Sequence, residues 1–364
     1  MLSNDVIKIL NSLAPEHLSD SWDNSGLQIG SRRKEVKKIL VSLDFGREVL
    51  NKAIFEGFDM VVTHHPFFFG EIKNLSTDGV RGEMIRDAIK HDIVVYSAHT
   101  NIDVAKDGMN KLIAEKLGLG KTAPIAPTST DSLYKLAVYV PKEDGEKLRK
   151  AAGDAGAGSL GNYDHCSFTL SGEGRFRPLE GSDPHIGSKD SLEVVEELKL
   201  EFVVEKSKLK YVLDAVLEAH PYEEVAYDIY RLENEGESMG YGGIGTIERE
   251  QSLIDFAKSA KENLQCSEIR VYGDLEQKIK RVAFCGGSGA SFIGSVAGKA
   301  DVYVTGDIKY HDAQKAKEEG LALIDAGHFG TEHLIVDYLA DFLREKTGLK
   351  VGISKHDFSE HITL

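Results

Sequence analysis

The sequence predicts an α/β protein with a duplicated α/β core of mainly parallel sheets, interrupted by an inserted ferredoxin-like domain of the α+β class. Three observations support this fold class. Strands and helices alternate in both outer parts of the chain, which implies right-handed βαβ crossovers. Between these parts the predicted order changes to βαββαβ. The two outer parts also share short sequence segments, as expected of an internal repeat.

The N-terminal part carries the clearest alternation of strands and helices. A helix is expected over residues 4–14, because Val6, Ile9, Leu10 and Leu13 recur at helical spacing. Short β-branched runs bounded by polar turns predict the strands, and amphipathic stretches between them predict the helices. The expected strands are 36–43, 59–63 and 93–97, and the expected helices are 47–56, 82–90 and 108–117.

The middle of the chain is separated from the outer parts by two predicted linkers. Residues 122–132 are rich in Pro, Ser and Thr, and residues 233–245 contain five glycines. We therefore assign residues 1–125 and 240–364 to the core and residues 130–235 to the inserted domain. The inserted elements are expected to be strand 134–140, helix 145–155, strands 166–170 and 198–205, helix 207–219 and strand 225–232.

After the second linker the first pattern resumes. We expect a helix from Ser252, strands 268–272, 279–285, 301–305 and 321–325, and a final helix from about Thr331. Residues 59–63 match residues 301–305, and Ser97-Ala98-His99 matches Ala326-Gly327-His328.

This repeat predicts one shared site. Open α/β sheets place ligands at the carboxyl ends of their strands. The segments 63–65, 97–103, 305–307 and 325–328 should therefore lie on one side of one site. Because Thr63 and Thr305 end equivalent strands, His64 and His65 should lie opposite Gly306 and Asp307.

Composition narrows the function classes. The chain has 364 residues, with 44 Lys and Arg against 59 Asp and Glu, giving a net charge of −15. This balance argues against a broad nucleic-acid or membrane interface. The three cysteines are far apart, which indicates neither a disulfide framework nor a thiolate zinc site. With no export signal and no long apolar run, we expect a cytoplasmic location.

A metal site is predicted at the strand ends. His64 and His65 follow the buried strand 59–63, which Pro66 stops. His328 and Glu332 lie one helical turn apart if a helix begins near Gly327. Adding Asp103 gives three imidazoles and two carboxylates without sulfur, a set that suits zinc, iron, manganese or cobalt. Five ligands fit two divalent ions about 3.5 to 4 Å apart, bridged by a carboxylate, for which we choose Glu332.

For several other residues near these segments, a functional and a structural interpretation are both possible. His99 and His311 could shuttle protons, and Asp307 could support the site, but a structural hydrogen bond explains each histidine equally well. The glycine-rich loop 286–291 follows a strand, so its backbone amides could bind phosphate, although a packing turn is equally consistent. The residues of this loop that we assign to phosphate binding are Gly287, Ser288 and Gly289.

Three further motifs receive simpler interpretations. The spacing from Gly240 to Gly245 matches the letters of a dinucleotide fingerprint but follows no strand, so we discard it. Residues 220–224 (His-Pro-Tyr-Glu-Glu) offer a metal ligand or an oligomer contact, but a helix stop with a solvated acidic edge is favoured. Trp22 stands beside the turn formed by residues 23–26, and we interpret it as a packed indole.

Five segments together resemble a known family. They are residues 22–30, 63–66, 100–103, 305–311 and 327–332, and they resemble the GTP cyclohydrolase I type 2 homologues, also called Nif-three-like dinuclear metal-centre proteins, in their longer bacterial form. The resemblance implies a toroidal homohexamer with metal sites facing an internal cavity. It also implies an inserted domain similar to the signalling and copper-tolerance trimers. The family's ligands carry over onto His64, His65, Asp103, His328 and Glu332.

We draw three functional hypotheses from the sequence. The leading one is a metal-dependent hydrolase of a small phosphorylated or nucleotide-like substrate. Ring-opening hydrolysis of GTP is one version of it, suggested only by the family name. The second is a non-enzymatic metal carrier or storage ring, and the third is a regulatory scaffold whose inserted domain binds a small effector.

Overall fold

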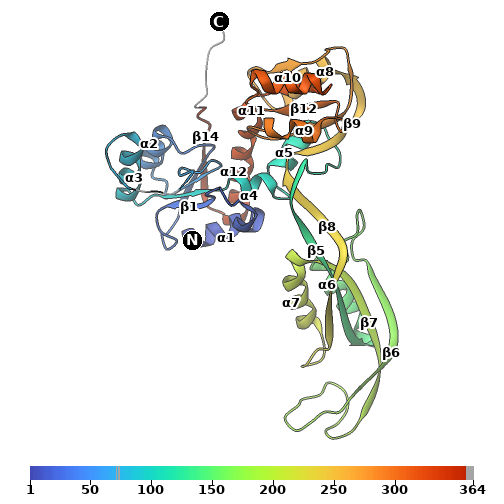
Figure 1. The fold of residues 1–364 in the computed structure, drawn as a ribbon. Helices are drawn as coiled ribbons and strands as arrows, with labels where there is room; N and C mark the ends of the chain where they lie inside the picture. Colours follow the sequence, from blue (N-terminus) through green and yellow to red (C-terminus); the bar gives the residue numbers. More distant parts are fainter. Residues whose placement is uncertain (71, 73, 358–364) are drawn as a thin grey trace. The chain divides into compact units, whose positions relative to one another are not determined.

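The computed structural model describes residues 1–70, 72 and 74–357, and the chain divides into two compact units. The first unit, the core unit, contains residues 1–129 and the chain from residue 239 onward. The second, the inserted unit, contains residues 130–238. Two five-stranded sheets belong to the core unit and a four-stranded sheet belongs to the inserted unit (Figure 1).

The first sheet of the core unit has the strand order β1-β4-β3-β2-β14. Strands β4, β3, β2 and β14 run parallel, and β1 is antiparallel to β4. Every residue of β3 and β4 is buried, which explains their continuous apolar sequence. The strands are Gly26–Ile29 (β1), Lys38–Ser42 (β2), Met60–Thr63 (β3), Val94–Ser97 (β4) and Lys350–Ser354 (β14).

Helices cover both faces of this sheet. Side chains alternate along a strand, so Ile39 and Leu40 of β2 point to opposite faces. Ile39 belongs to a buried cluster with Leu10 of α1, and Leu40 belongs to another with Leu50 of α2. The helices of this part are Ser3–Leu13 (α1), Glu16–Leu18 (η1, a 3₁₀ turn), Arg47–Glu56 (α2), Val80–Lys90 (α3), Thr100–Val104 (α4) and Met109–Lys116 (α5).

The second sheet of the core unit has the order β10-β13-β12-β11-β9. Its two central pairings are parallel and its two edge pairings are antiparallel. The sheet is therefore mixed rather than mainly parallel, because antiparallel edge strands need no crossover helix. Its strands are Gly243–Ser252 (β9), Arg270–Tyr272 (β10), Lys278–Phe284 (β11), Val302–Thr305 (β12) and Ala322–Asp325 (β13).

Six helical segments follow β9 along the chain, and the last of them, α12, packs against β2 and β14 of the first sheet. Ser252 caps the first of them, since its side chain accepts a hydrogen bond from the backbone of Asp255. These segments are Leu253–Asn263 (α8), Ala290–Phe292 (η4), Ile293–Val296 (α9), Tyr310–Glu318 (α10), His328–Glu332 (α11) and Leu334–Thr347 (α12).

The two sheets have similar strand orders, and equivalent local hydrogen bonds occur within each of them. The carboxylate of Asp59 accepts from the backbone amides of residues 37 and 38, and that of Asp301 accepts from residues 280 and 281. The amide of Ala98 donates to Thr63 at 2.9 Å, and the amide of Ala326 donates to Thr305 at 2.8 Å. Ala98 and Ala326 therefore occupy equivalent positions.

This register corrects one predicted match. If Ala98 corresponds to Ala326, then His99 corresponds to Gly327 and Thr100 to His328. The predicted pairing of His99 with His328 was wrong by one residue. The short helices α4 and α11 begin at Thr100 and His328, which agrees with the corrected register.

The inserted unit has the element order β5, α6, β6, β7, α7, β8 and the strand order β6-β7-β5-β8. Leu148 of α6 and Val216 of α7 pack against Val138 and Leu200 on one face of this sheet. The elements are Ala126–Pro141 (β5), Lys142–Asp144 (η2), Gly145–Asp154 (α6), Ser167–Phe176 (β6), Glu193–Glu205 (β7), Lys206–Lys208 (η3), Leu209–Ala219 (α7) and Tyr227–Tyr241 (β8).

Both predicted linkers proved to be largely strand. β5 begins at Ala126 within the first one, and β8 continues to Tyr241 within the second, where β9 then starts at Gly243. Their outer ends are half-buried or exposed, with Gly240 the one buried position, so they lack the apolar alternation that marks a strand in sequence. Gly240 marks the close pairing, because a Cβ there would overlap the Ala126 carbonyl oxygen.

Strands β1 and β14 and the helix α4 were also absent from the predictions. β1 and β14 are only partly buried and lack the continuous apolar run that marks β3 and β4, and α4 has only five residues, too few for helical periodicity to show. None of the helices in the part of the chain that the structure describes is long and apolar enough to cross a lipid bilayer.

Candidate metal centre

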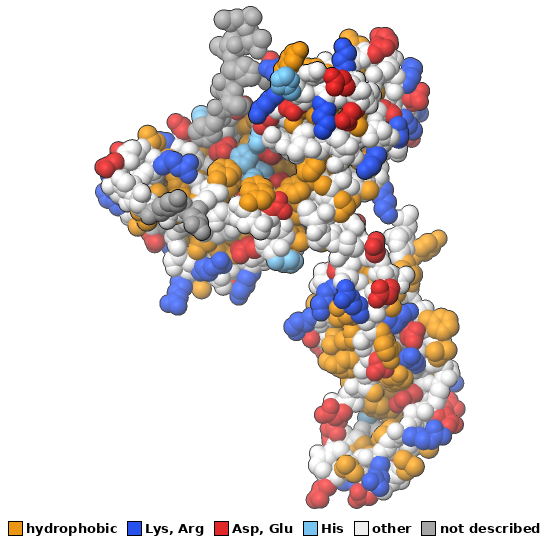
Figure 2. Space-filling model, in the orientation of Figure 1, with side chains coloured by type: hydrophobic (Ala, Val, Ile, Leu, Met, Phe, Trp, Pro, Cys, Tyr) orange, Lys and Arg blue, Asp and Glu red, His pale blue; other side chains and the backbone are white. Residues whose placement is uncertain are grey.

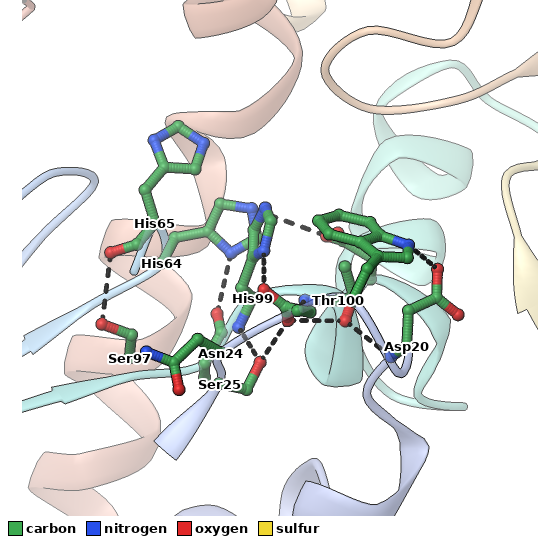
Figure 3. Close-up of polar contacts among 12 residues, drawn as sticks. Asp20, Asn24, Ser25, His64, His65, Ser97, His99 and Thr100 are labelled. Atoms are coloured by element: carbon green, nitrogen blue, oxygen red, sulfur yellow. Dashed lines mark hydrogen bonds and ion pairs between the residues drawn. The ribbon is translucent and has the colours of Figure 1, made fainter. Parts of the chain in front are cut away.

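The histidine pair lies at the carboxyl end of β3, as predicted. The backbone amides of His64 and His65 both donate to the Leu43 carbonyl, at 3.1 and 2.9 Å. The Thr63 hydroxyl and the Ser97 hydroxyl contact the His65 carbonyl at 2.8 and 3.2 Å. These bonds hold the backbone turn, and the two rings lie with centroids 5.0 Å apart (Figure 3).

Three imidazoles of the site are oriented by hydrogen bonds at Nδ1. Each partner is a carbonyl or a carboxylate, so Nδ1 donates and Nε2 remains available as a ligand atom. The pairs are His64 with the Ala98 carbonyl at 2.9 Å, His65 with Asp44 at 2.8 Å and His328 with Asp307 at 2.7 Å.

Two of these Nε2 atoms meet one oxygen of Glu332. Oε2 lies 2.9 Å from His65 and 3.0 Å from His328, and the two Nε2 atoms are 3.4 Å apart. His328 and Glu332 are four residues apart on α11, as the sequence predicted. Nitrogen atoms this close to each other and to a carboxylate suit a shared cation.

The other oxygen of Glu332 faces a second set of groups. His64 Nε2 lies 3.5 Å from Asp103 Oδ1 and 3.8 Å from Glu332 Oε1. His64 is fully buried, and its Nε2 has no hydrogen-bond partner among the described residues. An orphaned buried nitrogen beside two carboxylates is costly unless a cation joins them, so the residues present fit a metal ion.

The charges of the cluster are strongly coupled. Burial alone would raise the pKa of Glu332, but its interactions with His328, His64 and His65 hold the pKa well below the usual range. Burial would lower the pKa of His65, but its hydrogen bonds to Asp44 and Glu332 raise it to about 10. The hydrogen bond to Glu332 raises the pKa of His328 to about 9. Such shifts are typical of functional sites.

Burial and neighbouring charges also shift the groups on the other side of Glu332. Burial would lower the pKa of His64, but the carboxylates of Asp103 and Glu332 raise it. Burial, reinforced by Glu332, raises the pKa of Asp103.

His99 stands beside the cluster on a network of its own. Its Nδ1 lies 2.8 Å from Asp23, whose side chain is fully buried. That carboxylate also accepts from the hydroxyls of Ser25 and Thr100, both at 2.7 Å (Figure 3). Burial would raise the pKa of Asp23, but these hydrogen bonds lower it far below the usual range.

Two groups of side chains in the described chain could hold a metal ion. They are His64, His65 and His99, and His65, His328 and Glu332, with the ligand atoms of each group within 4.8 Å of one another. His99, which the sequence suggested as a proton shuttle or as a residue with a structural hydrogen bond, is thus close enough to be a ligand. Figure 2 shows histidine side chains at the base of a hollow in the core unit, with hydrophobic side chains at its rim.

Of three other residues singled out in the sequence, one lies beside the cluster and two were wrongly predicted. Asp307 does lie beside the cluster, bonded to His328. His311 was wrongly grouped with it, because the side chain is exposed on α10 and its Nδ1 lies 3.4 Å from the side-chain oxygen of Gln314. Trp22 is 61% exposed, so the prediction of a packed indole was wrong.

Two of the three loop residues assigned to phosphate binding use their backbone amides for hydrogen bonds within the protein. The amide of Gly287 donates to Thr331 at 2.9 Å, and that of Gly289 donates to Thr305 at 3.0 Å, while Ser288 is exposed. The loop has another role. Gly287 adopts φ +60°, and a Cβ there would overlap Oε1 of Glu332, so the glycine makes room for this carboxylate.

Sequence reasoning missed two orienting carboxylates. Asp44 follows the predicted strand 36–43 directly, so the strand-end argument that found His64 could have found it. Asp23 was taken as part of a turn, and no periodic signal distinguishes it there.

The fold and the site define a class, namely α/β proteins with a histidine and carboxylate cluster able to bind a metal ion between two similar sheets. The chain belongs to the Duf34/NIF3 (NGG1p interacting factor 3) family, whose profile matches residues 1–361. It is similar to a Bacillus subtilis protein named GTP cyclohydrolase 1 type 2 homolog, with 45% identity over 97% of this chain and 96% of the relative.

Two further comparisons agree. A Halalkalibacterium halodurans protein of the same name is 42% identical over 89% of this chain and 87% of the relative. The crystal structure of a Bacillus cereus protein related to NIF3 has a TM-score of 0.86 and 40% identity, covering 100% of this chain and 99% of that one.

Proposed function

We propose that the core unit binds two divalent transition-metal ions and hydrolyses a small phosphorylated or nucleotide-like substrate. One observation carries this proposal: the two oxygens of Glu332 face different ligand sets. One ion would be held by His64, Asp103 and Oε1, and the other by His65, His328 and Oε2. Three protein ligands for each ion leave coordination positions open, as catalytic sites require.

The metals would supply Lewis-acid chemistry that polarises the bond under attack and makes water a stronger acid. The protein's own residues prepare this chemistry. Asp44, Asp307 and the Ala98 carbonyl fix the three ligand imidazoles, which keeps each Nε2 pointed at the site. His99, oriented by Asp23, would hold or release a proton at Nε2. Zinc, iron, manganese and cobalt all accept this nitrogen and oxygen set.

The test combines metal analysis with turnover. Protein purified without chelator should carry close to two metal ions per chain, and Glu332→Ala should lose both metal and turnover on a panel of nucleotides and phosphate esters. Glu319→Ala, an exposed carboxylate, is the matched control. Two metals without Glu332-dependent turnover would refute the hydrolase and leave a metal carrier or storage ring. Less than one metal after reconstitution would refute the site.

A second candidate function is regulation through the inserted unit. A cavity of about 520 Å³ in that unit falls within the size range of small-molecule sites. Its wall includes Phe176, His185 and Tyr222, and the Tyr222 hydroxyl donates to Glu197 at 3.1 Å. A small effector held there would make this unit a sensor for the core.

His220 shapes this cavity rather than binding metal. Its Nε2 donates to the Tyr139 carbonyl at 2.9 Å, and its Nδ1 accepts from the Tyr222 amide at 3.0 Å. Burial lowers its pKa. Both nitrogens are used, which favours the helix-stop reading of this motif. Metabolite screening by thermal shift, with Tyr222→Ala as the comparison, tests the regulatory candidate; no hit that depends on Tyr222 would refute it.

We also propose a fold for the inserted unit and an oligomeric state for the protein. The βαββαβ order of the inserted unit and its strand order support a ferredoxin-like fold similar to the signalling and copper-tolerance trimers. We expect a toroidal homohexamer of duplicated core units, from the family resemblance. Sedimentation velocity tests this assembly, and a monomer or dimer would refute it.

A further inference from the structure

We infer that Trp22 and Phe69 form a binding platform for a planar aromatic or heteroaromatic ring of the substrate. This inference rests on the proposed function, because it places the ring beside the metal cluster. Trp22 is 61% exposed and Phe69 is 58% exposed, yet both contact His99. Large exposed aromatic side chains next to a polar cluster are typical of ligand contacts.

Both rings meet the same imidazole in the same manner. The Trp22 and Phe69 centroids lie 6.1 and 6.0 Å from that of His99, with interplanar angles of 82° and 89°. His99 in turn lies 5.3 Å from the ring of His64 and 5.7 Å from that of His65. The two aromatic side chains therefore border the site on the His99 side.

A network of hydrogen bonds holds Trp22 in its exposed position. Its indole N–H donates to Asp20 at 2.9 Å, and the same carboxylate oxygen accepts from the Tyr241 hydroxyl at 2.7 Å. The Asp20 amide donates to the Thr100 hydroxyl, which itself donates to Asp23, the partner of His99 (Figure 3). One chain of hydrogen bonds thus fixes the indole relative to the cluster.

Phe69 is tied to the same turn. Asn24 donates to the Phe68 carbonyl at 2.8 Å, and the Phe68 amide donates to Gln28 at 3.2 Å. Residues 22–28 therefore set the position of both aromatic side chains. A phosphate group alone would gain nothing from two fixed apolar rings, whereas a planar ring gains by stacking.

The chain contains one tryptophan, so its fluorescence reports directly on the platform. The experiment compares GMP and UMP with ribose 5-phosphate, which shares the phosphate and lacks the ring. We expect the nucleotides to quench Trp22 and to bind roughly 5- to 150-fold more tightly than ribose 5-phosphate by calorimetry. Trp22→Ala and Phe69→Ala should each remove most of that preference, and Trp22→Phe should retain it.

Matched controls and separate readouts keep the outcomes distinct. Phe55 and Tyr310 are 91% and 81% exposed elsewhere on the core unit, so Phe55→Ala and Tyr310→Ala should leave nucleotide binding unchanged. Titrations are run with zinc-loaded and metal-free protein, and metal content is measured for every variant. A failure to hold metal would refute the proposed function, and the titrations of metal-free protein would still test the platform.

Two results would overturn the inference. The first is that neither nucleotide quenches Trp22 or binds more tightly than ribose 5-phosphate. The second is that Trp22→Ala or Phe69→Ala changes the oligomeric state by sedimentation velocity, which would assign these rings to an interface between copies of the chain.

Discussion

Replacing Asp44 by asparagine should weaken metal binding without touching a metal ligand. Asp44 Oδ1 lies 2.8 Å from Nδ1 of His65 and fixes both the orientation of the ring and the position of its proton. The asparagine side chain has nearly the same shape but lacks the charge. His65 becomes a poorer ligand, because the carboxylate no longer increases its basicity.

The structure sets the size of this effect. Losing the group that orients a ligating histidine generally costs 10- to 100-fold in metal affinity, or about 1.4 to 2.8 kcal/mol. The side chain of Asp44 is 36% exposed, so water screens part of the interaction, and the asparagine oxygen can still accept a hydrogen bond. We therefore expect the lower part of that range, about 10- to 30-fold.

Competition with a chromophoric chelator measures zinc affinity for wild type and Asp44→Asn. Asp92→Asn is the control, because Asp92 is 65% exposed and forms an ion pair with Lys34 on the protein surface. The control should change affinity by less than about twofold. A folded Asp44→Asn protein with zinc affinity within about threefold of wild type would refute the orienting role.

Three further predictions concern the same cluster. Gly287→Ala should cost about 1 to 2 kcal/mol of stability through its positive φ and should displace Glu332, so thermal unfolding and metal stoichiometry should both fall. In the metal-free fold the pKa values of His65 and His328 are raised to about 10 and about 9, so metal must displace both protons at neutral pH. Zinc affinity should therefore rise by up to about 100-fold per pH unit between pH 7 and 8, which calorimetry measures; a flat profile would contradict the charges described. The stability of the metal-free protein should fall as pH rises from about 6.5 through 9 and 10, which unfolding at a series of pH values measures. His311→Ala should leave metal content and turnover unchanged, and a loss of either would restore it to the site.

Sequence reasoning predicted most of the buried elements, and it singled out histidines and carboxylates that the structure places close together. The helix predicted over residues 47–56 is α2 with the same bounds, and the strand predicted over 59–63 is β3 from Met60. The helix buries one face and the strand is fully buried, so the pattern of apolar residues in the sequence reveals both. The polar outer ends of β5 and β8 pair with little apolar burial, and their composition therefore resembled a linker.

Side-chain direction after a strand could not be derived from the sequence. His99 and His311 both follow predicted strand ends, but only His99 faces the cluster. Direction there depends on single backbone angles, such as φ +57° at Asp307, which propensity does not encode. The exposure of Trp22 likewise depends on the hydrogen bond of its indole to Asp20, a contact between side chains two residues apart.

The corrected register explains why two similar halves supply different side chains to the cluster. His65 and Asp307 occupy equivalent places after β3 and β12. The Nε2 atom of His65 contacts Glu332, whereas the carboxylate of Asp307 contacts Nδ1 of His328 and orients that ring. On the equivalent helices α4 and α11, Asp103 corresponds to Thr331 and Val104 to Glu332. Each half therefore offers a carboxylate from its short helix, one residue out of step. Neither half contains the whole cluster of histidines and carboxylates, so the proposed metal centre requires both sheets to be folded together.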